Sequence, residues 1–433
     1  MRVDDLPVPT IGGDRPTTER WPAHLFIGVQ RQPVSSYVYD DFTANYDDPE
    51  GDFTYDDQQD FPYDRYDLFC NFHGLTITSG TNDPEGRFEA GHVEMTLDNR
   101  DGSLSQYDAS GRLVDYFPGR ALDIWATIDG EAFWLFSGEI TAWRERADDT
   151  IEAEAFDAFT RLNQKVPQWN PGNYGDTVDQ RLGKIRDAFF YTGPTRFDHG
   201  TVTLHSFFTT ATPLEEMQAV ALSDGGILFT DADGTLTYRD RMWLLGRGDQ
   251  PEIPIFSDNV CDAPYTVWDS EMLTDDDVIV NVANLTNVAK VSLSARNDNS
   301  VLRYGEHTLE HTADQWISTA DGSDLANFLV SRLGDAYLRL EQFSLHLPAP
   351  HQDAWRVGID RRLGDVVTWV HEQAATTGAD LLVLNLIVRS INHAITPETW
   401  VATFATSRTV GSTIVQRYDR TTYRYDQGGV YVI

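Results

Sequence analysis

The stretch FEAGHVEMTLDNRDG, residues 88–102, decides the fold class of this chain. Residues 88–97 are predicted to form a strand, which the turn cluster DNRDG ends. Apolar residues then alternate with more polar neighbours over residues 122–128, and Asp129-Gly130 predicts a tight hairpin into residues 133–136. Short strands separated by regular turn signals favour a small barrel or sandwich.

Strands of the same kind are predicted on both sides of this region. Before it, the segment Ala-His-Leu-Phe-Ile-Gly-Val at residues 23–29 has the composition of a strand. After it, several short apolar runs are bounded by turn residues. These predicted strands are residues 140–143, 151–156, 227–229, 236–238, 278–282, 288–293, 343–347, 366–369, 381–388 and 400–405.

Helices are predicted only in short pieces. The clearest begins at Thr212-Pro-Leu-Glu215, where threonine caps the helix, proline takes its first position and glutamate completes a capping box. Gly225-Gly226 supplies its end. Two further helices are expected around Leu182, Ile185 and Phe189, and from Ser323 or Asp324 onward.

These elements predict a mainly β fold of the α+β class, with two barrel-like β domains flanking a mixed segment that contains short helices. The expected divisions are an N-terminal leader with an acidic-aromatic segment at 1–71, a first barrel-like domain at 72–165, a mixed α/β segment at 166–250, a second barrel-like domain with a helix at 251–410 and a C-terminal tail at 411–433.

Composition excludes several classes of protein. The 433 residues are 41% hydrophobic and 12% aromatic, which is enough for sizeable cores. The net charge of −35 has the wrong sign for gripping nucleic acid phosphates. Cys70 and Cys261 cannot form a disulfide framework. Without a signal-peptide pattern or a membrane-length apolar run, we expect a soluble, acidic protein made in the cytoplasm, with no membrane anchor.

The most unusual segment is Asp40–Asp67, which contains eleven acidic residues, one basic residue and seven aromatics. Its spacing fits neither a helix nor a strand, so an extended, turn-rich segment is expected. Its side chains could bind calcium or a basic partner, or could dock on the chain's own sheet. Our hypothesis is that contact with a neighbouring subunit or with another protein of its assembly orders it. The candidate contact residues are Tyr39, Tyr46, Phe53, Tyr55, Tyr63 and Tyr66.

Motifs that carry chemistry are weak throughout. The sequence has no phosphate-binding loop, no Gly-x-Ser-x-Gly motif and no complete zinc-protease motif. His307 and His311 have a spacing that could bind a metal, but no third ligand is evident. The Asp231-Ala-Asp-Gly234 motif resembles the start of a calcium loop and is better explained as a hairpin turn. We therefore expect no catalytic residues, no metal site, no cofactor and no enzyme activity.

The order of motifs resembles that of minor tail proteins from long-tailed phages of actinobacteria. The resemblance covers about residues 72–405, and its motifs are individually weak. They are the opening stretch at 88–102, Tyr116-Phe-Pro-Gly-Arg120, Leu135-Phe-Ser-Gly-Glu-Ile140, Ala153-Glu-Ala-Phe-Asp157, the helix at Pro213, Gly225-Gly-Ile-Leu-Phe229, Asp233-Gly-Thr-Leu-Thr-Tyr-Arg-Asp240, Asn297-Asp-Asn-Ser-Val301, Tyr304-Gly305 and the helix at 325–333.

This family resembles the baseplate hub of contractile-tailed phages, and the resemblance implies a structural virion protein at the phage tail tip. Three copies would form a ring that joins the tail tube to the tip. The implied partners are the distal tail protein or tail tube, the tape-measure protein and other tail-tip proteins. DNA would pass through the channel without specific binding, which suits negative walls. The acidic-aromatic segment departs from the family pattern, so its role stays open.

Two other functions stay open at this point. One is a receptor- or carbohydrate-binding tail-tip protein, in which exposed tryptophans such as Trp125 or Trp355 stack on sugars. The other is a cell-wall hydrolase associated with the tail, although the sequence leaves no residues for a separate catalytic domain.

Overall fold

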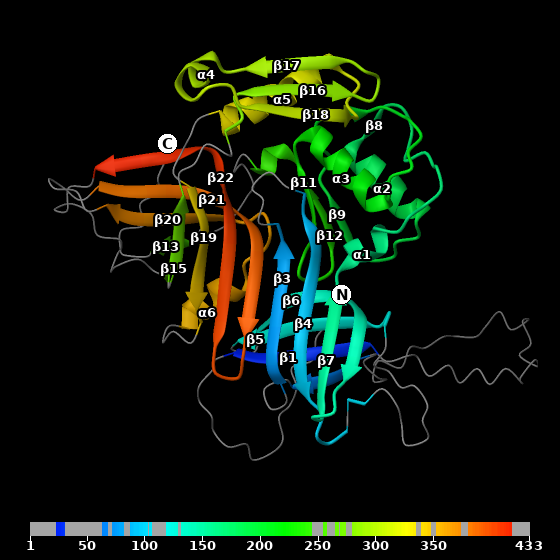
Figure 1. Cartoon of the computed structure of the whole chain (residues 1–433), viewed down its shortest axis with the longest axis vertical. Helices are drawn as coiled ribbons and strands as arrows, with labels where there is room; N and C mark the ends of the chain where they lie inside the picture. The colour runs from blue at the N-terminus through cyan, green and yellow to red at the C-terminus, as the bar shows by residue number, and fades with distance from the viewer. Residues whose placement is uncertain are drawn as a thin grey trace, which may run out of the picture.

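The computed structural model describes residues 23–30, 63–67, 72–81, 87–102, 104–105, 118–128, 131–244, 254–257, 265–267, 269–273, 279–334, 339–347, 352–373 and 380–417. Figure 1 shows a long, mainly antiparallel sheet with helices beside it and a smaller sheet at the top. The large sheet contains fourteen of the strands in this part of the chain.

The first β region follows the order predicted from the opening stretch. Its strands are β1 (Ala23–Gln30), β2 (Tyr63–Asp67), β3 (Phe72–Gly80), β4 (Glu89–Asp98), β5 (Ala121–Ile128), β6 (Glu131–Glu145) and β7 (Thr150–Phe156). They pair in the order β3-β4-β7-β6-β5-β1-β2. The runs predicted as separate strands at 133–136 and 140–143 belong to the single strand β6, which passes through a register shift between Ile140 and Ala142.

The second β region is formed by β13 (Ile255–Ser257), β14 (Tyr265–Thr266), β15 (Asp269–Leu273), β19 (Arg339–His346), β20 (Val366–Gln373), β21 (Asp380–Ile395) and β22 (Trp400–Arg417), with helix α6 (Gln352–Ile359). The strands predicted at 343–347, 366–369, 381–388 and 400–405 are confirmed, and three of them are much longer than the apolar runs that indicated them.

Strand β21 joins the two β regions into one sheet. One edge of β21 pairs first with β20, through Asp380 to Ile387, and then with β3, through Ser390 to Ile395. At the change of partner, the Thr81 N–H donates to the Arg389 carbonyl at 2.9 Å. Gly80 has a φ of 97° there, and a β-carbon on it would lie 2.1 Å from the Arg389 carbonyl oxygen, so this close approach requires glycine. A single large hydrophobic core therefore spans both regions.

The mixed segment lies between these regions in sequence. Its elements are α1 (Ala158–Leu162), β8 (Asp176–Thr177), α2 (Val178–Ala188), β9 (Thr195–Phe197), β10 (Thr203–Leu204), α3 (Pro213–Asp224), β11 (Ile227–Thr230) and β12 (Leu236–Arg239). The capping box is present as predicted, because the Glu215 N–H donates to Thr212 Oγ1 at 3.2 Å and the Thr212 N–H donates to Glu215 Oε2 at 2.7 Å. Gly225, with a φ of 75°, ends α3 in the left-handed conformation.

A smaller unit at the top of Figure 1 has its own sheet and its own core. It contains β16 (Val282–Asn287), β17 (Ser292–Arg296), α4 (Asp298–Tyr304), β18 (Thr308–Asp314) and α5 (Thr319–Leu333). The bounds predicted for these strands, 278–282 and 288–293, were wrong by about four residues. Residues 288–290 form the turn between β16 and β17.

The predicted start of α5 was also wrong. Its cap is Ser318, whose side chain accepts a hydrogen bond from the Ala320 N–H at 3.1 Å. Asp321-Gly322 resembles a turn signal, but Gly322 lies inside the helix. A β-carbon there would approach the Trp316 ring to 2.7 Å, so packing explains the glycine.

The fold class is confirmed as mainly β, with β regions on both sides of a mixed segment that contains short helices. Within the described ranges, no helix is both long enough and apolar enough to span a membrane.

Candidate functional site

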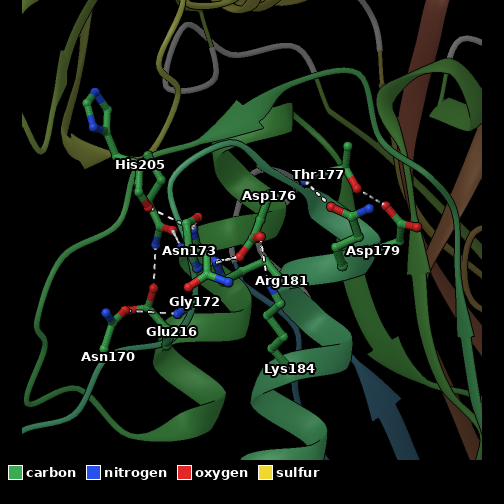
Figure 2. A network of polar contacts seen from close by, with 12 residues as sticks. Asn170, Gly172, Asn173, Asp176, Thr177, Asp179, Arg181, Lys184, His205 and Glu216 are labelled. Atoms are coloured by element: carbon green, nitrogen blue, oxygen red, sulfur yellow. Dashed lines mark hydrogen bonds and ion pairs between the residues drawn. The ribbon is translucent and has the colours of Figure 1, made fainter.

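An extensive buried polar network of the mixed segment surrounds Arg181 of α2 (Figure 2). The guanidinium is fully buried. Its Nε donates to Asp176 Oδ2 at 3.2 Å and its Nη1 donates to Gln315 Oε1 at 3.1 Å. Its Nη2 donates to the carbonyl oxygens of Asn173 at 2.9 Å and His205 at 2.8 Å. One side chain thereby connects strand β8, the loops at Asn173 and His205, and the residue that follows β18.

Asp176 is the anionic partner of this cation. It also accepts from Lys184 Nζ at 2.5 Å and from the Asn173 N–H at 2.7 Å. Burial alone would raise the pKa of Asp176, but these hydrogen bonds and the Arg181 charge lower it instead. Asp176 is therefore held as a carboxylate within the network.

Glu216 of α3 extends the network across the helix pair. Gln315 Nε2 donates to Glu216 Oε1 at 2.6 Å, and the Gln315 N–H donates to Ser223 Oγ at 2.9 Å. Burial raises the pKa of Glu216, although the Gln315 hydrogen bond and the Arg181 charge oppose the rise. The network thus ties α2 and α3 of the mixed segment to the smaller unit at Gln315. Its groups are directed at one another, which suits a structural clamp better than catalysis.

A cavity of about 90 Å³ lies nearby, where α3, β18 and α5 meet. Its polar lining includes Arg87, Gln218, His311, Arg332 and Arg389, and the rest is mainly aliphatic and aromatic. This volume admits a few water molecules or one small anion, and it is too small for a saccharide chain.

The predicted contact residues fall into two groups. Tyr39, Tyr46, Phe53 and Tyr55 lie outside the described residues. Tyr63 and Tyr66 lie on β2, where Tyr63 pairs with Gln30 and Tyr66 pairs with Ile27 of β1. This end of the acidic-aromatic segment is therefore a strand rather than a turn-rich stretch. The contact role of all six residues stays a prediction.

The weak metal motifs adopt other structures. His307 precedes β18 and His311 lies on it, so the two residues stand about 13 Å apart along an extended chain. His307 Nε2 lies 3.2 Å from the Tyr304 carbonyl oxygen, and His311 Nδ1 lies 3.8 Å from Asp314 Oδ1. Asp231 begins the predicted turn between β11 and β12. Across the ranges that the structure describes, no three His, Cys, Asp or Glu residues are grouped as a metal would require.

The tryptophans suggested for sugar stacking are not available for it. Trp125 is 6% exposed and Trp355 is 1% exposed. The Trp355 ring packs edge-on against Trp400, with ring centroids 5.5 Å apart. Their aromatic area stabilises the core, so the prediction that they are exposed was wrong.

The buried Arg181 network was missed in the sequence, although a signal was present. The buried side chains of α2 are Val178, Arg181, Leu182 and Ile185, which follow the spacing of one helical face. An arginine within an otherwise apolar face indicates a buried, partnered cation.

Two solved structures share this fold. The tail protein from Neisseria meningitidis MC58 matches with a TM-score of 0.54 at 13% sequence identity, over 80% of this chain and 94% of that chain. The 43 kDa tail protein of prophage MuSo2 from Shewanella oneidensis matches with a TM-score of 0.51 at 14% identity, over 80% of this chain and 96% of that chain. No protein-family model matches this chain, and no curated protein does. At the level of the fold, the predicted resemblance is confirmed: this chain has the fold of phage tail proteins.

Proposed function

We propose that this chain is a structural protein of a phage tail tip, where copies of it form a ring-shaped hub between the tail tube and the tip. The observation that carries the proposal is the extent of the shared fold. Two tail proteins are covered over 94% and 96% of their length, and the matched part includes most of this chain.

In this role three copies of the chain surround a channel. The partners are the distal tail protein or tail tube, the tape-measure protein and other tail-tip proteins. DNA crosses the channel without being bound, because a chain with a net charge of −35 repels phosphates and gains no affinity from counterion release. The protein is made in the host cytoplasm and functions in the virion, without catalysis.

The mass of the native assembly, measured at several protein concentrations, tests this proposal. A hub should give a species of three times the 48.8 kDa chain mass over a wide concentration range. A chain that stays monomeric at every concentration, and in the presence of purified tail tubes, would refute the ring.

Two other functions are tested by direct assays. A glycan array would detect carbohydrate binding, for which the buried Trp125 and Trp355 provide no surface. Zymography on cell-wall material would detect a hydrolase. The Arg181 network favours neither, since its polar atoms bind one another.

A further inference from the structure

Phe190 adopts a backbone conformation that favours glycine. It follows the C-terminus of α2 with a φ of 52°. The Phe190 N–H donates to the Asp187 carbonyl at 3.3 Å, and the Tyr191 N–H donates to the Arg186 carbonyl at 3.1 Å. This pair of bonds is the Schellman arrangement, whose left-handed residue is usually glycine because a β-carbon crowds the backbone there. A bulky aromatic residue at this position is strained.

The Phe190 side chain gains little burial within the chain to offset that strain. It is 87% exposed, and Phe208 and Tyr174 are 68% and 65% exposed. These three are among only five large hydrophobic side chains that are exposed in the described part of the chain, and all three belong to the mixed segment. Exposed apolar groups that gather in this way indicate an interaction site.

Contacts around Trp169 bring Phe190 and Phe208 to the same part of the surface. The Trp169 ring packs edge-on against Phe189, the neighbour of Phe190, with centroids 4.8 Å apart. The Trp169 backbone exchanges hydrogen bonds of 3.0 and 2.9 Å with Thr209, the neighbour of Phe208. The Tyr174 ring packs edge-on against the His205 ring, with centroids 5.3 Å apart, and His205 lies on the same loop as Phe208. We name Tyr174, Phe190 and Phe208 the aromatic surface.

The segment that carries the aromatic surface differs in charge from the rest of the protein. Residues 161–211 contain six basic and four acidic residues, a net charge of +2, whereas the whole chain carries −35. Two of the three lysines in the sequence, Lys165 and Lys184, lie in it, and both are exposed. An acidic partner is therefore repelled less by this segment than by the rest of the chain, and aromatic residues of that partner could pack on the exposed rings.

We propose that the aromatic surface binds residues 40–62 of a second copy of this chain, the part of the acidic-aromatic segment that precedes strand β2. Residues 40–62 have nine acidic residues, no lysine or arginine and five aromatics, so their charge and side-chain type suit the surface. Because the two contacting parts are different, each copy presents one to the next, and such head-to-tail contacts form a ring when the rotation between copies closes. The inference rests on the proposed ring and specifies the contact that closes it.

The substitution Phe190→Gly separates this role from a merely local one. It relieves the backbone strain, so the thermal unfolding temperature of the chain should stay the same or rise. The concentration at which half of the protein is assembled should nevertheless increase at least tenfold, measured by native mass. Leu302→Ala is the matched control, because Leu302 is 86% exposed on α4, away from the aromatic surface. It should leave assembly within twofold of the wild type.

The identity of the bound segment is tested with a benzophenone-bearing amino acid in place of Phe208, in a mixture of ¹⁵N-labelled and unlabelled chains. Cross-linked peptides should join position 208 to residues 40–62 in pairs of mixed label. Links confined to single-label pairs, or to other regions, would overturn the docking. A ring that forms normally in Phe190→Gly would also overturn it while leaving the proposed function intact, whereas a wild-type chain that never assembles would overturn both.

Discussion

Replacing Arg181 with methionine should destabilise the mixed segment strongly. Methionine preserves the apolar stem but removes every donor of the guanidinium, leaving Asp176, Gln315 and two carbonyl oxygens without them. Breaking a buried ion pair costs about 3–5 kcal/mol. Lys184 still reaches the Asp176 carboxylate at 2.5 Å, so a loss of about 3 kcal/mol in the free energy of unfolding is expected.

Urea denaturation monitored by circular dichroism would measure this loss, and hydrogen exchange of α2 would locate it. Arg186→Met is the matched control on the same helix. Arg186 forms a partly exposed ion pair with Asp187, and such pairs contribute about 0–1 kcal/mol. If Arg181→Met costs no more than Arg186→Met, the network does not clamp the segment as we argue.

Three further outcomes are expected. Burial lowers the pKa of His393 to about 4. The stability that comes from keeping this imidazole neutral is therefore fully present above pH 6.5, the pKa in the unfolded chain, and is lost as the pH falls toward 4. The free energy of unfolding, measured by urea denaturation, should fall between pH 7 and pH 4.5 by about 2–3 kcal/mol less in His393→Gln than in the wild type. Gly322→Ala should lose about 1–3 kcal/mol despite better helix propensity, because the new methyl group meets Trp316. On α2, a β-carbon at Gly183 would have no neighbour within 4 Å, so Gly183→Ala should raise the free energy of unfolding by up to about 1 kcal/mol in the same assay. If both alanine substitutions raised it, the packing argument would be contradicted. Deleting residues 40–62, which spares strand β2, should impair tail joining in an assembly assay but leave the thermal unfolding of the β regions largely intact; lost folding would contradict this.

Local chemistry made parts of this fold predictable. The Thr212 capping box and the Asp231 turn depend on residues within four positions of each other, and both are present as predicted. Strand length was less predictable. β22 continues to Arg417, well beyond the apolar run at 400–405, because pairing with β21 supplies its hydrogen bonds. Such pairing depends on residues distant in sequence.

The candidate site was harder to predict for the same reason. Arg181 interacts with Gln315, which lies 134 positions away. In the sequence Gly322 resembles a turn residue, and only the structure shows that the Trp316 ring leaves no room for a β-carbon there. The exposure of Phe190 depends on how the end of α2 is positioned. A positive φ at a phenylalanine could not be predicted from the sequence either. Sequence therefore indicated the kinds of element well and their partners poorly.

The shared strand β21 also determines how the two β regions can move. Its register shifts between Val388 and Ser390, where its edge changes partner from β20 to β3. The N–H groups of Gly364 and Thr81, one from each region, donate to the carbonyls of Val388 and Arg389 at this step. A bulge of this kind bends the strand, and these two bonds hold both regions to it at the bend. Force applied to one region would therefore load this ladder and pass to the other region, so we expect the two β regions to move as one body.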